Sequence, residues 1–483
     1  MNRKRIFFTV GLIILIEAAL LFLPLLISLI YQDGCSLSFL AAIGVAAVFG
    51  GALMILCRKH DRVIYAREGF LIVSLGWLAL SCIGALPFVF SGAIPDYADA
   101  FFETVSGFTT TGASILKDVE VLSPLKSILF WRSFTHWIGG MGILVFVMAV
   151  IPNGNDRGIH IVRAEMPGPI VGKLVPKMRD TAKILYLIYL GMTVLQIVLL
   201  TFGEMDLFES AVHAFGTAGT GGFGIKSASL AGYSAYSQWV IGVFMLLFGV
   251  NFNLYYLFLI RKFKSAFKSS EFWTYLGIVA VSVGFVFKEI LPRFDNVSDA
   301  IRAAFFQVSS IITTTGFSTD DFNLWSPLAK GILISLMFIG ACAGSTGGGL
   351  KVSRVVILFK RIRIEVKRLL HPRSVSVVKF EGRTVDDATL SSVSNYFALY
   401  VLIFVFIFLL LSALNSFDFE TNFSAAAACY NNIGPGFGAV GPLSSYADYS
   451  VLSKIILSFA MLFGRLEIWP LILALSPTVW AKK

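Results

Sequence analysis

Charge is scarce in this chain of 483 residues, and its cysteines follow no pattern. Only 14% of the residues are charged, whereas 57% are hydrophobic and 45 are Phe. The five cysteines are scattered and odd in number, without paired or metal-ligand spacing, so they carry no information about chemistry. A chain with so little charge and so much apolar surface is typical of a polytopic membrane protein.

Motifs of catalysis and metal binding are missing as well. We find no catalytic triad, no His/Cys cluster and no pair of carboxylates within one predicted site. Residues 436–441 fit the dinucleotide fingerprint, but no strand precedes them and no βαβ unit surrounds them. Residues 344–351 resemble a phosphate loop, but the lysine is not adjacent to the last glycine and no Ser or Thr follows it. The sequence therefore predicts neither an enzyme nor an organic cofactor.

What the chain does contain is a series of long apolar runs. A helix needs roughly 20 such residues to cross the hydrocarbon core of a membrane. Ten runs are candidates, at residues 6–31, 37–57, 69–93, 125–151, 182–203, 237–260, 272–291, 328–358, 393–415 and 451–476. The first follows a basic start without a small-residue cleavage site, so we expect a retained span. We therefore expect an all-α polytopic membrane protein with ten spans.

The net charge of +10 is spread unevenly along the chain. Lys and Arg collect in alternate loops, at residues 2–5, 58–67, 157–183, 261–268, 351–383 and 482–483. By the positive-inside rule these segments and both termini face the cytoplasm, so the charge does not indicate nucleic acid binding. Acidic residues fall in the opposite loops and predict an outer mouth that attracts cations. Acidic outer loops without any function are the alternative.

One short sequence occurs twice and defines an internal repeat. Thr-Thr-Thr-Gly stands at 109–112 and at 313–316, each time with Phe-Phe starting eleven residues before the glycine and Ser-Pro-Leu after it. Between later pairs of spans, short apolar segments lead into the glycine-rich turns 216–223 and 431–436. We align the turn glycines as Gly112, Gly221, Gly316 and Gly434. The repeat predicts four tandem units of span, short pore helix, glycine turn and span.

The residues of these turns are typical of an ion-selectivity filter. Irregular backbone at membrane depth is tolerated only where it is buried in protein or lines water. Four such turns around one axis would present backbone carbonyls that replace the water shell of a cation. Glycine permits the backbone conformations required, and short helices that end at the turns point their partly negative C-termini at the cation. The repeat therefore predicts a central ion pore.

A second group of glycines interrupts the predicted span at 328–358. Residues 340–349 include five glycines in ten residues. Because each glycine costs roughly 1 kcal/mol relative to alanine in a helix, we expect a loop in mid-membrane. Such a loop below the filter would act as a gate that opens the pore when it is displaced. Close helix packing through small residues is the alternative.

Together these features resemble the superfamily of Trk, Ktr and HKT potassium transporters, most closely its bacterial TrkH-type members. The resemblance covers essentially the whole chain, because two N-terminal spans followed by four span-pore-span units is the plan of that family. It is carried by the four turns and by the sequences at 137–143 (WIGGMGI), 344–349 (GSTGGG), 431–436 (NNIGPG) and 464–467 (GRLE). It implies potassium uptake. A sodium or poorly selective monovalent-cation transporter of the same fold is the alternative.

The resemblance also implies which residues form the filter and the gate. The implied potassium-binding residues are Thr110, Thr111, Gly112, Thr220, Gly221, Gly222, Thr315, Gly316, Phe317, Asn432, Ile433 and Gly434. The implied gate residues are Gly344, Ser345, Thr346, Gly347, Gly348, Gly349, Lys351 and Arg465. Arg465 and Lys351 have an alternative explanation, because either side chain could extend to headgroups at the inner end of its span. Further polar groups within the spans, Arg132, His136, Asn251 and Asn253, are given no role.

The family plan divides the chain and predicts its partners. The expected parts are an N-terminal helix pair at 1–60 and four pore units at 61–180, 181–268, 269–384 (with the gate loop) and 385–483. Relatives are homodimers that bind a cytoplasmic nucleotide-binding ring subunit, so we expect both partners, in a bacterial cytoplasmic membrane. The basic loops 157–183 and 361–383 are long enough to dock the ring, although they equally suit anionic lipids.

Two questions stay open at the level of sequence. The transported potassium ion could move as in a channel or be coupled to protons or sodium. No span carries an obvious proton-relay carboxylate, and Glu17, which lies outside the repeats, is an unsuitable candidate for coupling. A membrane enzyme that holds a phosphate group in its glycine turns is the alternative from another class. It predicts phosphate-ligand binding without cation flux.

Overall fold

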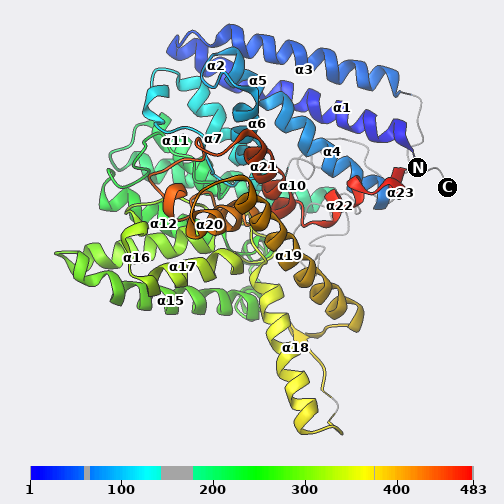
Figure 1. Ribbon diagram of the computed structural model, residues 1–483, viewed down its shortest axis with the longest axis vertical. Helices are drawn as coiled ribbons and strands as arrows, with labels where there is room; N and C mark the ends of the chain where they lie inside the picture. The colour runs from blue at the N-terminus through cyan, green and yellow to red at the C-terminus, as the bar shows by residue number, and fades with distance from the viewer. Residues whose placement is uncertain (1, 59–65, 143–177, 375, 481–483) are drawn as a thin grey trace.

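The computed structural model describes residues 2–58, 66–142, 178–374 and 376–480, and this part of the chain is almost entirely helical (Figure 1). Its only strands there are β1 (Lys379–Phe380) and β2 (Arg383–Thr384), which pair as a short antiparallel hairpin. The predicted all-α class is therefore confirmed. Most of the predicted basic loops 157–183 and 58–67, together with the terminal lysines, lies outside the described residues.

The N-terminal helices pack against α4, α5 and α7. α1 (Arg3–Leu20) continues as α2 (Phe22–Tyr31) and lies beside α3 (Ser36–Leu56) (Figure 1). The two helices approach through Gly11 and Gly50, where a Cβ on either residue would lie 2.7 or 2.9 Å from the carbonyl oxygen of the other. Small residues permit this distance between helices that have only lipid as the alternative neighbour.

Four long helices each precede a short helix that is largely buried. The pairs are α4 (Ala66–Gly84) with α6 (Tyr97–Phe108), α10 (Met178–Thr201) with α11 (Leu207–Ala218), α15 (Ser270–Ile290) with α16 (Val297–Ile312), and α19 (Asp387–Leu414) with α20 (Phe419–Tyr430). Three of the short helices start at an aspartate (Asp96, Asp206 or Asp418) whose carboxylate accepts the N–H three residues on. This cap fixes where each short helix begins.

The helix that follows each short helix has fewer than the roughly 20 residues needed to cross a membrane. α7 (Lys126–Gly140), α12 (Ala235–Phe248), α17 (Pro327–Ile339) and α21 (Val451–Arg465) have 15, 14, 13 and 15 residues. After its break the chain continues as α13 (Phe252–Leu259), α18 (Val352–Leu370) and α22 (Trp469–Leu475) in the last three cases. α12 and α13 meet at 92°. Short elements complete the list: α5 (Leu86–Phe90), η1 (Glu120–Leu122), α14 (Phe263–Ala266), η3 (Leu291–Arg293), η4 (Phe322–Leu324), η5 (Gly438–Val440) and α23 (Pro477–Trp480).

The breaks correct the predicted count of ten continuous spans. Among the described residues six helices are long and apolar enough to cross a membrane alone, or seven if α12 and α13 count as one span. The predicted spans 237–260, 328–358 and 451–476 are each divided between two helices, and in 125–151 the described helix ends at Gly140. The loop expected within 328–358 is present, at residues 340–351.

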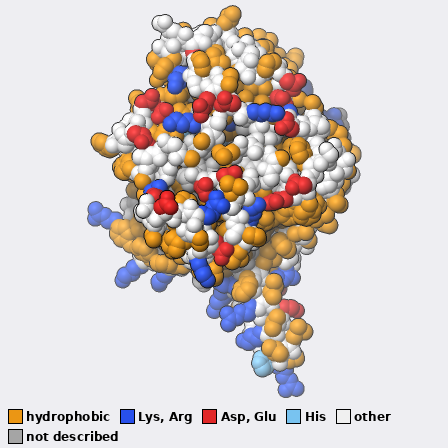
Figure 2. Space-filling view, turned by 60° about the vertical axis from the view of Figure 1, so that its left-hand side comes forward, with side chains coloured by type: hydrophobic (Ala, Val, Ile, Leu, Met, Phe, Trp, Pro, Cys, Tyr) orange, Lys and Arg blue, Asp and Glu red, His pale blue; other side chains and the backbone are white. Residues whose placement is uncertain are grey.

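α18 and the start of α19 form an arm that projects from the body of the molecule (Figure 1). Basic side chains follow the arm, whereas acidic and basic side chains are mixed on the face above it (Figure 2). The basic residues of α18 and of the turn that follows are Arg354, Lys360, Arg361, Arg363, Lys367, Arg368 and Arg373. The predicted loop 351–383 is therefore largely helix.

Candidate functional site

The four glycine turns have the same backbone conformation. In each, the first and third residues have positive φ: Thr110 (56°) and Gly112 (80°), Thr220 (56°) and Gly222 (76°), Thr314 (58°) and Gly316 (85°), Asn432 (58°) and Gly434 (98°). The N–H of each middle residue donates to a carbonyl five residues earlier, in the preceding short helix, at 2.8 Å. The middle residues are Thr111, Gly221, Thr315 and Ile433. The sequence repeat is thus a structural repeat.

The turns close into a ring in chain order. A Cβ built on Gly112 would lie nearer than 3.0 Å to the carbonyl oxygen of Gly221 in the next turn. Gly222 has the same relation to Thr315, Gly316 to Ile433, and Gly434 to Thr111. Each turn therefore touches its successor, and the fourth touches the first. Only glycine fits at the third position, because the backbone is left-handed and a neighbouring carbonyl occupies the space of a Cβ.

Two positions of the predicted filter differ in register from the sequence alignment. Gly222, not Gly221, is equivalent to Gly112, because it carries the positive φ and contacts the next turn. In the third turn, Thr314 is equivalent to Thr110 and was not among the predicted residues. Phe317 follows the turn and its buried ring lies 5.9 Å from that of His213. Consistent alignment of the two Thr-Thr-Thr-Gly copies would have identified Thr314.

The polar side chains of the turns hold the turns in place. The hydroxyl oxygens of Thr109 and Thr111 are 2.7 Å apart. Those of Thr313 and Thr315 are 2.8 Å apart. In the fourth turn Asn432 donates from Nδ2 to Thr111 Oγ1 at 3.0 Å and thereby joins the last turn to the first. The hydroxyls thus brace the carbonyl-bearing backbone.

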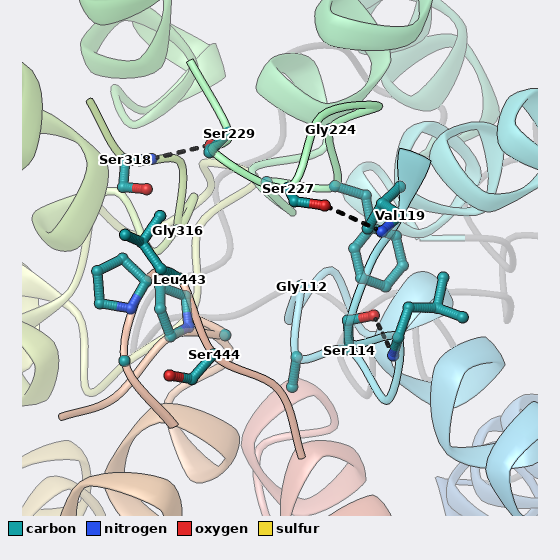
Figure 3. A pocket seen from close by; sticks show the side chains of 18 of the residues that line it. Gly112, Ser114, Val119, Gly224, Ser227, Ser229, Gly316, Ser318, Leu443 and Ser444 are labelled. Carbon is teal, nitrogen blue, oxygen red and sulfur yellow. Dashed lines mark hydrogen bonds between the residues drawn. The ribbon is translucent and has the colours of Figure 1, made fainter. Parts of the chain in front are cut away.

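The loops that follow the turns surround one cavity of about 90 Å³, with room for several water molecules (Figure 3). Residues of all four units line it, including Ser114, Ser227, Ser318 and Ser444. Hydrogen bonds join some of these loops, as between Val119 N and Ser227 Oγ at 3.2 Å.

The charged side chains that line this cavity are basic, in contrast to the acidic mouth predicted from sequence. They are Lys117, Arg132 and Lys226. The carboxylates lie further out, where Asp448 is 2.6 Å from Lys117 Nζ and Asp118 accepts from Ser227 Oγ at 2.7 Å. That bond and one from the Glu120 N–H lower the pKa of Asp118.

A buried ion pair joins α6 to α7 and bonds to the segments that follow the first two turns. Glu103 on α6 and Arg132 on α7 are 2.6 Å apart, with side chains 0% and 3% exposed. Glu103 also accepts from Ser114 Oγ and from the Ile115 N–H, both at 2.9 Å. Arg132 donates to the Gly224 carbonyl at 3.0 Å. The sequence analysis gave Arg132 no role, because nothing local joins positions 29 apart.

The loop 340–351 lies against the third turn of the ring. Gly348 N–H donates to Thr314 Oγ1 at 2.6 Å, and a Cβ on Gly347 would lie 2.8 Å from the carbonyl oxygen of Thr313. The loop is buried, and even Lys351 is only 2% exposed. Its Nζ donates to the Gly347 carbonyl within the loop.

The broken helices and the loop satisfy each other's backbone groups. Helix ends leave N–H and C=O groups unpaired. At the break between α12 and α13, Cys342 N–H donates to the Gly249 carbonyl at 3.1 Å, and Phe252 N–H donates to the Gly344 carbonyl at 3.0 Å. The break is therefore placed where the loop can cap it, which a hydropathy pattern does not reveal.

Arg465, the last residue of α21, crosses the same region. Its guanidinium donates to the carbonyl of Thr346 in the loop at 2.8 Å and to the last carbonyls of α7, at Gly139 (2.5 Å) and Gly140 (2.7 Å). A cation at a helix C-terminus also interacts favourably with the helix dipole. Glu467 pairs instead with Arg354 at the start of α18. The structure thus brings Arg465 to the predicted gate loop, rather than to headgroups.

Known proteins place this arrangement in a family. The pattern of the TrkH family, described as a cation transport protein, matches residues 36–281 and 292–481. The chain belongs to the TrkH family. The Trk system potassium uptake protein TrkH of Escherichia coli (strain K12) is 39% identical over 480 residues, which are 98% of each chain. The protein of that name from Halomonas elongata is 35% identical and is covered in full.

A solved TrkH structure has the same fold. The crystal structure of the potassium transporter TrkH from Vibrio parahaemolyticus superposes with a TM-score of 0.88 at 34% identity, covering 100% of both chains. The resemblance inferred from the turns is therefore confirmed at the level of family and fold. As members of this family are transporters, the prediction that the chain is not an enzyme is confirmed as well.

Proposed function

We propose that this TrkH-family protein takes up potassium ions across the cytoplasmic membrane through a filter formed by the four turns. The observation that carries the proposal is the closed ring, in which four equivalent backbones from one chain meet around one axis. Positive φ at the first and third residues gives each turn an irregular backbone at the centre of the ring. Rings of such carbonyls replace the hydration shell of a potassium ion.

The residues of the filter follow from the structural register. The proposed potassium-binding backbone is that of Thr110–Gly112, Thr220–Gly222, Thr314–Gly316 and Asn432–Gly434. Relative to the sequence prediction, this choice adds Thr314 and leaves out Phe317. The short helices end at the turns, so their partly negative C-termini favour a cation there.

Gating is the proposed role of the loop 340–351 and Arg465. The contact between Gly348 and Thr314 Oγ1 leaves the loop directly against the filter, and the Arg465 charge lies beside it. Both would oppose cation passage in this conformation. Displacement of the loop is the proposed opening step, for which its glycines provide the backbone freedom.

Topology and partners remain proposals of the same kind. We propose cytoplasmic termini, the division into an N-terminal pair and four pore units, a homodimer and a nucleotide-binding ring subunit. The basic arm supports a cytoplasmic position for α18, because Lys and Arg are enriched on that side of membrane proteins.

Tracer uptake tests the proposed function. Rubidium uptake into proteoliposomes that contain the purified chain is measured with potassium or sodium as competitor, for the wild type and Gly316→Ser. We expect potassium to compete strongly, sodium weakly, and the substitution to erode this preference. If sodium competes as well as potassium in the wild type, the alternative of a poorly selective transporter holds. If no cation moves, even with the ring subunit and its nucleotide, the proposed function is wrong.

A further inference from the structure

Glu271, in the first turn of α15, is a buried carboxylate that the filter and the gate as described do not use. It is 4% exposed. Its Oε1 accepts the backbone N–H of Ala343 at 2.7 Å and that of Ser353 at 3.1 Å. Ala343 lies in the loop 340–351, and Ser353 lies in the first turn of α18, just after the loop. One oxygen atom therefore joins the loop to the start of α18.

Capping of α15 does not account for Glu271. Ser269 is the N-cap of that helix, and its hydroxyl accepts the N–H of Phe272. A buried N–H group that loses its acceptor costs more free energy than one hydrogen bond contributes on average. A buried carboxyl group that accepts one N–H from the loop and one from the first turn of α18 therefore stabilises the conformation in which the loop closes on the filter.

The hairpin β1–β2 holds the first turn of α15 from the other side. Glu381 Oε1 accepts from Ser269 Oγ at 3.1 Å, from Ser270 Oγ at 3.2 Å and from the Glu271 N–H at 2.9 Å. Glu381 and Gly382 form the two-residue turn, with φ of 49° and 74°. Two left-handed residues are typical of a tight hairpin.

The hairpin also packs on the elements that carry the loop. Phe380 is buried in the same apolar cluster as Cys342 of the loop and Val352 at the start of α18. On its exposed side, Lys360 of α18 donates from Nζ to the Lys379 carbonyl at 3.0 Å. The hairpin therefore bonds to α18 and to the start of α15, and it shares a buried apolar cluster with the loop.

We propose that Glu271 is the positioning residue of the gate loop and that the hairpin, through Glu381, controls the position of Glu271. The inference rests on the proposed role of the loop as a gate. When the hairpin moves away from α15, the three bonds at Glu381 break and the first turn of α15 is released. The carboxyl group that joins the loop to the start of α18 then shifts, and the loop leaves the filter. A force on the arm reaches the filter by this route.

Basal rubidium uptake, without any activating partner, tests the proposal in proteoliposomes that contain the full chain. We expect Glu271→Ala to raise it about tenfold or more, because the closed state loses the two hydrogen bonds that Glu271 accepts. Glu271→Gln keeps an acceptor oxygen and should stay nearer to the wild type. Glu381→Ala should raise uptake as well, and Glu365→Ala, which removes an exposed carboxylate of α18, should not.

Two further readouts separate positioning from general destabilisation. The double variant Glu271→Ala with Glu381→Ala should take up no more rubidium than Glu271→Ala alone. The reason is that Glu381 acts on the loop only through the two bonds that Glu271 accepts. The preference for potassium over sodium should be unchanged, because the filter residues are untouched. If the increases in uptake of the two single variants multiply in the double variant, the proposed link from Glu381 through Glu271 to the loop is wrong. A loss of the preference for potassium would contradict it as well.

The negative outcomes are distinguishable. Wild-type basal uptake in folded Glu271→Ala overturns the inference, and so does wild-type uptake in Glu381→Ala. If Glu271→Ala does not fold, Glu381→Ala, at an exposed hairpin, decides alone. If Arg465→Ala opens the pathway and neither glutamate variant does, the gate stands and this inference falls. A wild type that moves no cation under any condition removes the proposed function itself.

Discussion

Gly222→Ala tests the ring geometry most directly. The φ of Gly222 is 76°, so a Cβ there brings about 1–2 kcal/mol of left-handed backbone strain. The same Cβ would lie nearer than 3.0 Å to the Thr315 carbonyl oxygen of the next turn. Forcing extra volume into a packed site costs typically about 1–3 kcal/mol. Together these terms disfavour the native filter by about 2–5 kcal/mol, at least about thirtyfold in its population.

A control variant separates strain from collision. Gly34, between α2 and α3, has a φ of 79° but nothing within 4 Å of the Cβ position. Gly34→Ala therefore carries the backbone strain alone. Rubidium uptake with sodium competition and thermal unfolding in detergent are measured for both variants. We expect Gly222→Ala to lose uptake or potassium preference, and Gly34→Ala to lose only a little thermal stability.

Retained selectivity would refute the reasoning. If Gly222→Ala transports with the wild-type preference for potassium, the second turn does not contact the third as described. If Gly34→Ala is equally impaired in selectivity, backbone strain anywhere in the chain is sufficient and the contact with Thr315 explains nothing.

Three further predictions concern buried charges. Arg465→Ala should raise basal rubidium uptake about tenfold or more, because the loop loses a charged donor; unchanged uptake would contradict its gate role. Glu103→Ala should lower the free energy of unfolding by about 3–5 kcal/mol, since Arg132 is left buried without a counter-charge. The double variant Glu103→Ala with Arg132→Met should recover part of the loss. A melting temperature of Glu103→Ala equal to that of the wild type would contradict this. Glu17→Met should raise stability by about 1–3 kcal/mol, because both buried carboxyl oxygens lack a hydrogen-bond partner among the described residues; a lowered melting temperature would indicate a role for that carboxyl.

The order of helices and turns could be predicted from the sequence, because hydropathy and the Thr-Thr-Thr-Gly repeat report directly on local structure. The breaks in α12 and α21 could not. Their apolar runs are continuous, and the break after α21 places Ile468 at a φ of 67°, which a β-branched residue adopts only when its surroundings enforce it. Ile468 is buried in the same apolar cluster as Leu350 of the loop, which comes from a distant part of the chain.

The candidate site shows the same division between local and distant information. The glycine loop was predicted because its composition disfavours a helix by itself. The register of the second turn was not, since Gly221 and Gly222 are adjacent and only the contact with Thr315 distinguishes them. The hydrogen bond from Ala343 to Glu271 joins residues 72 apart, so no sequence motif predicts it.

The ring of four turns on one polypeptide has a consequence for how the filter can vary. Its middle positions are Thr111, Gly221, Thr315 and Ile433, so each quadrant has its own side chain. In a pore built from four identical subunits one codon changes every quadrant together. Here one codon changes a single quadrant in every molecule of a homogeneous preparation. The dependence of ion preference on filter composition can therefore be measured by changing one quadrant at a time, without mixing different subunits in one assembly.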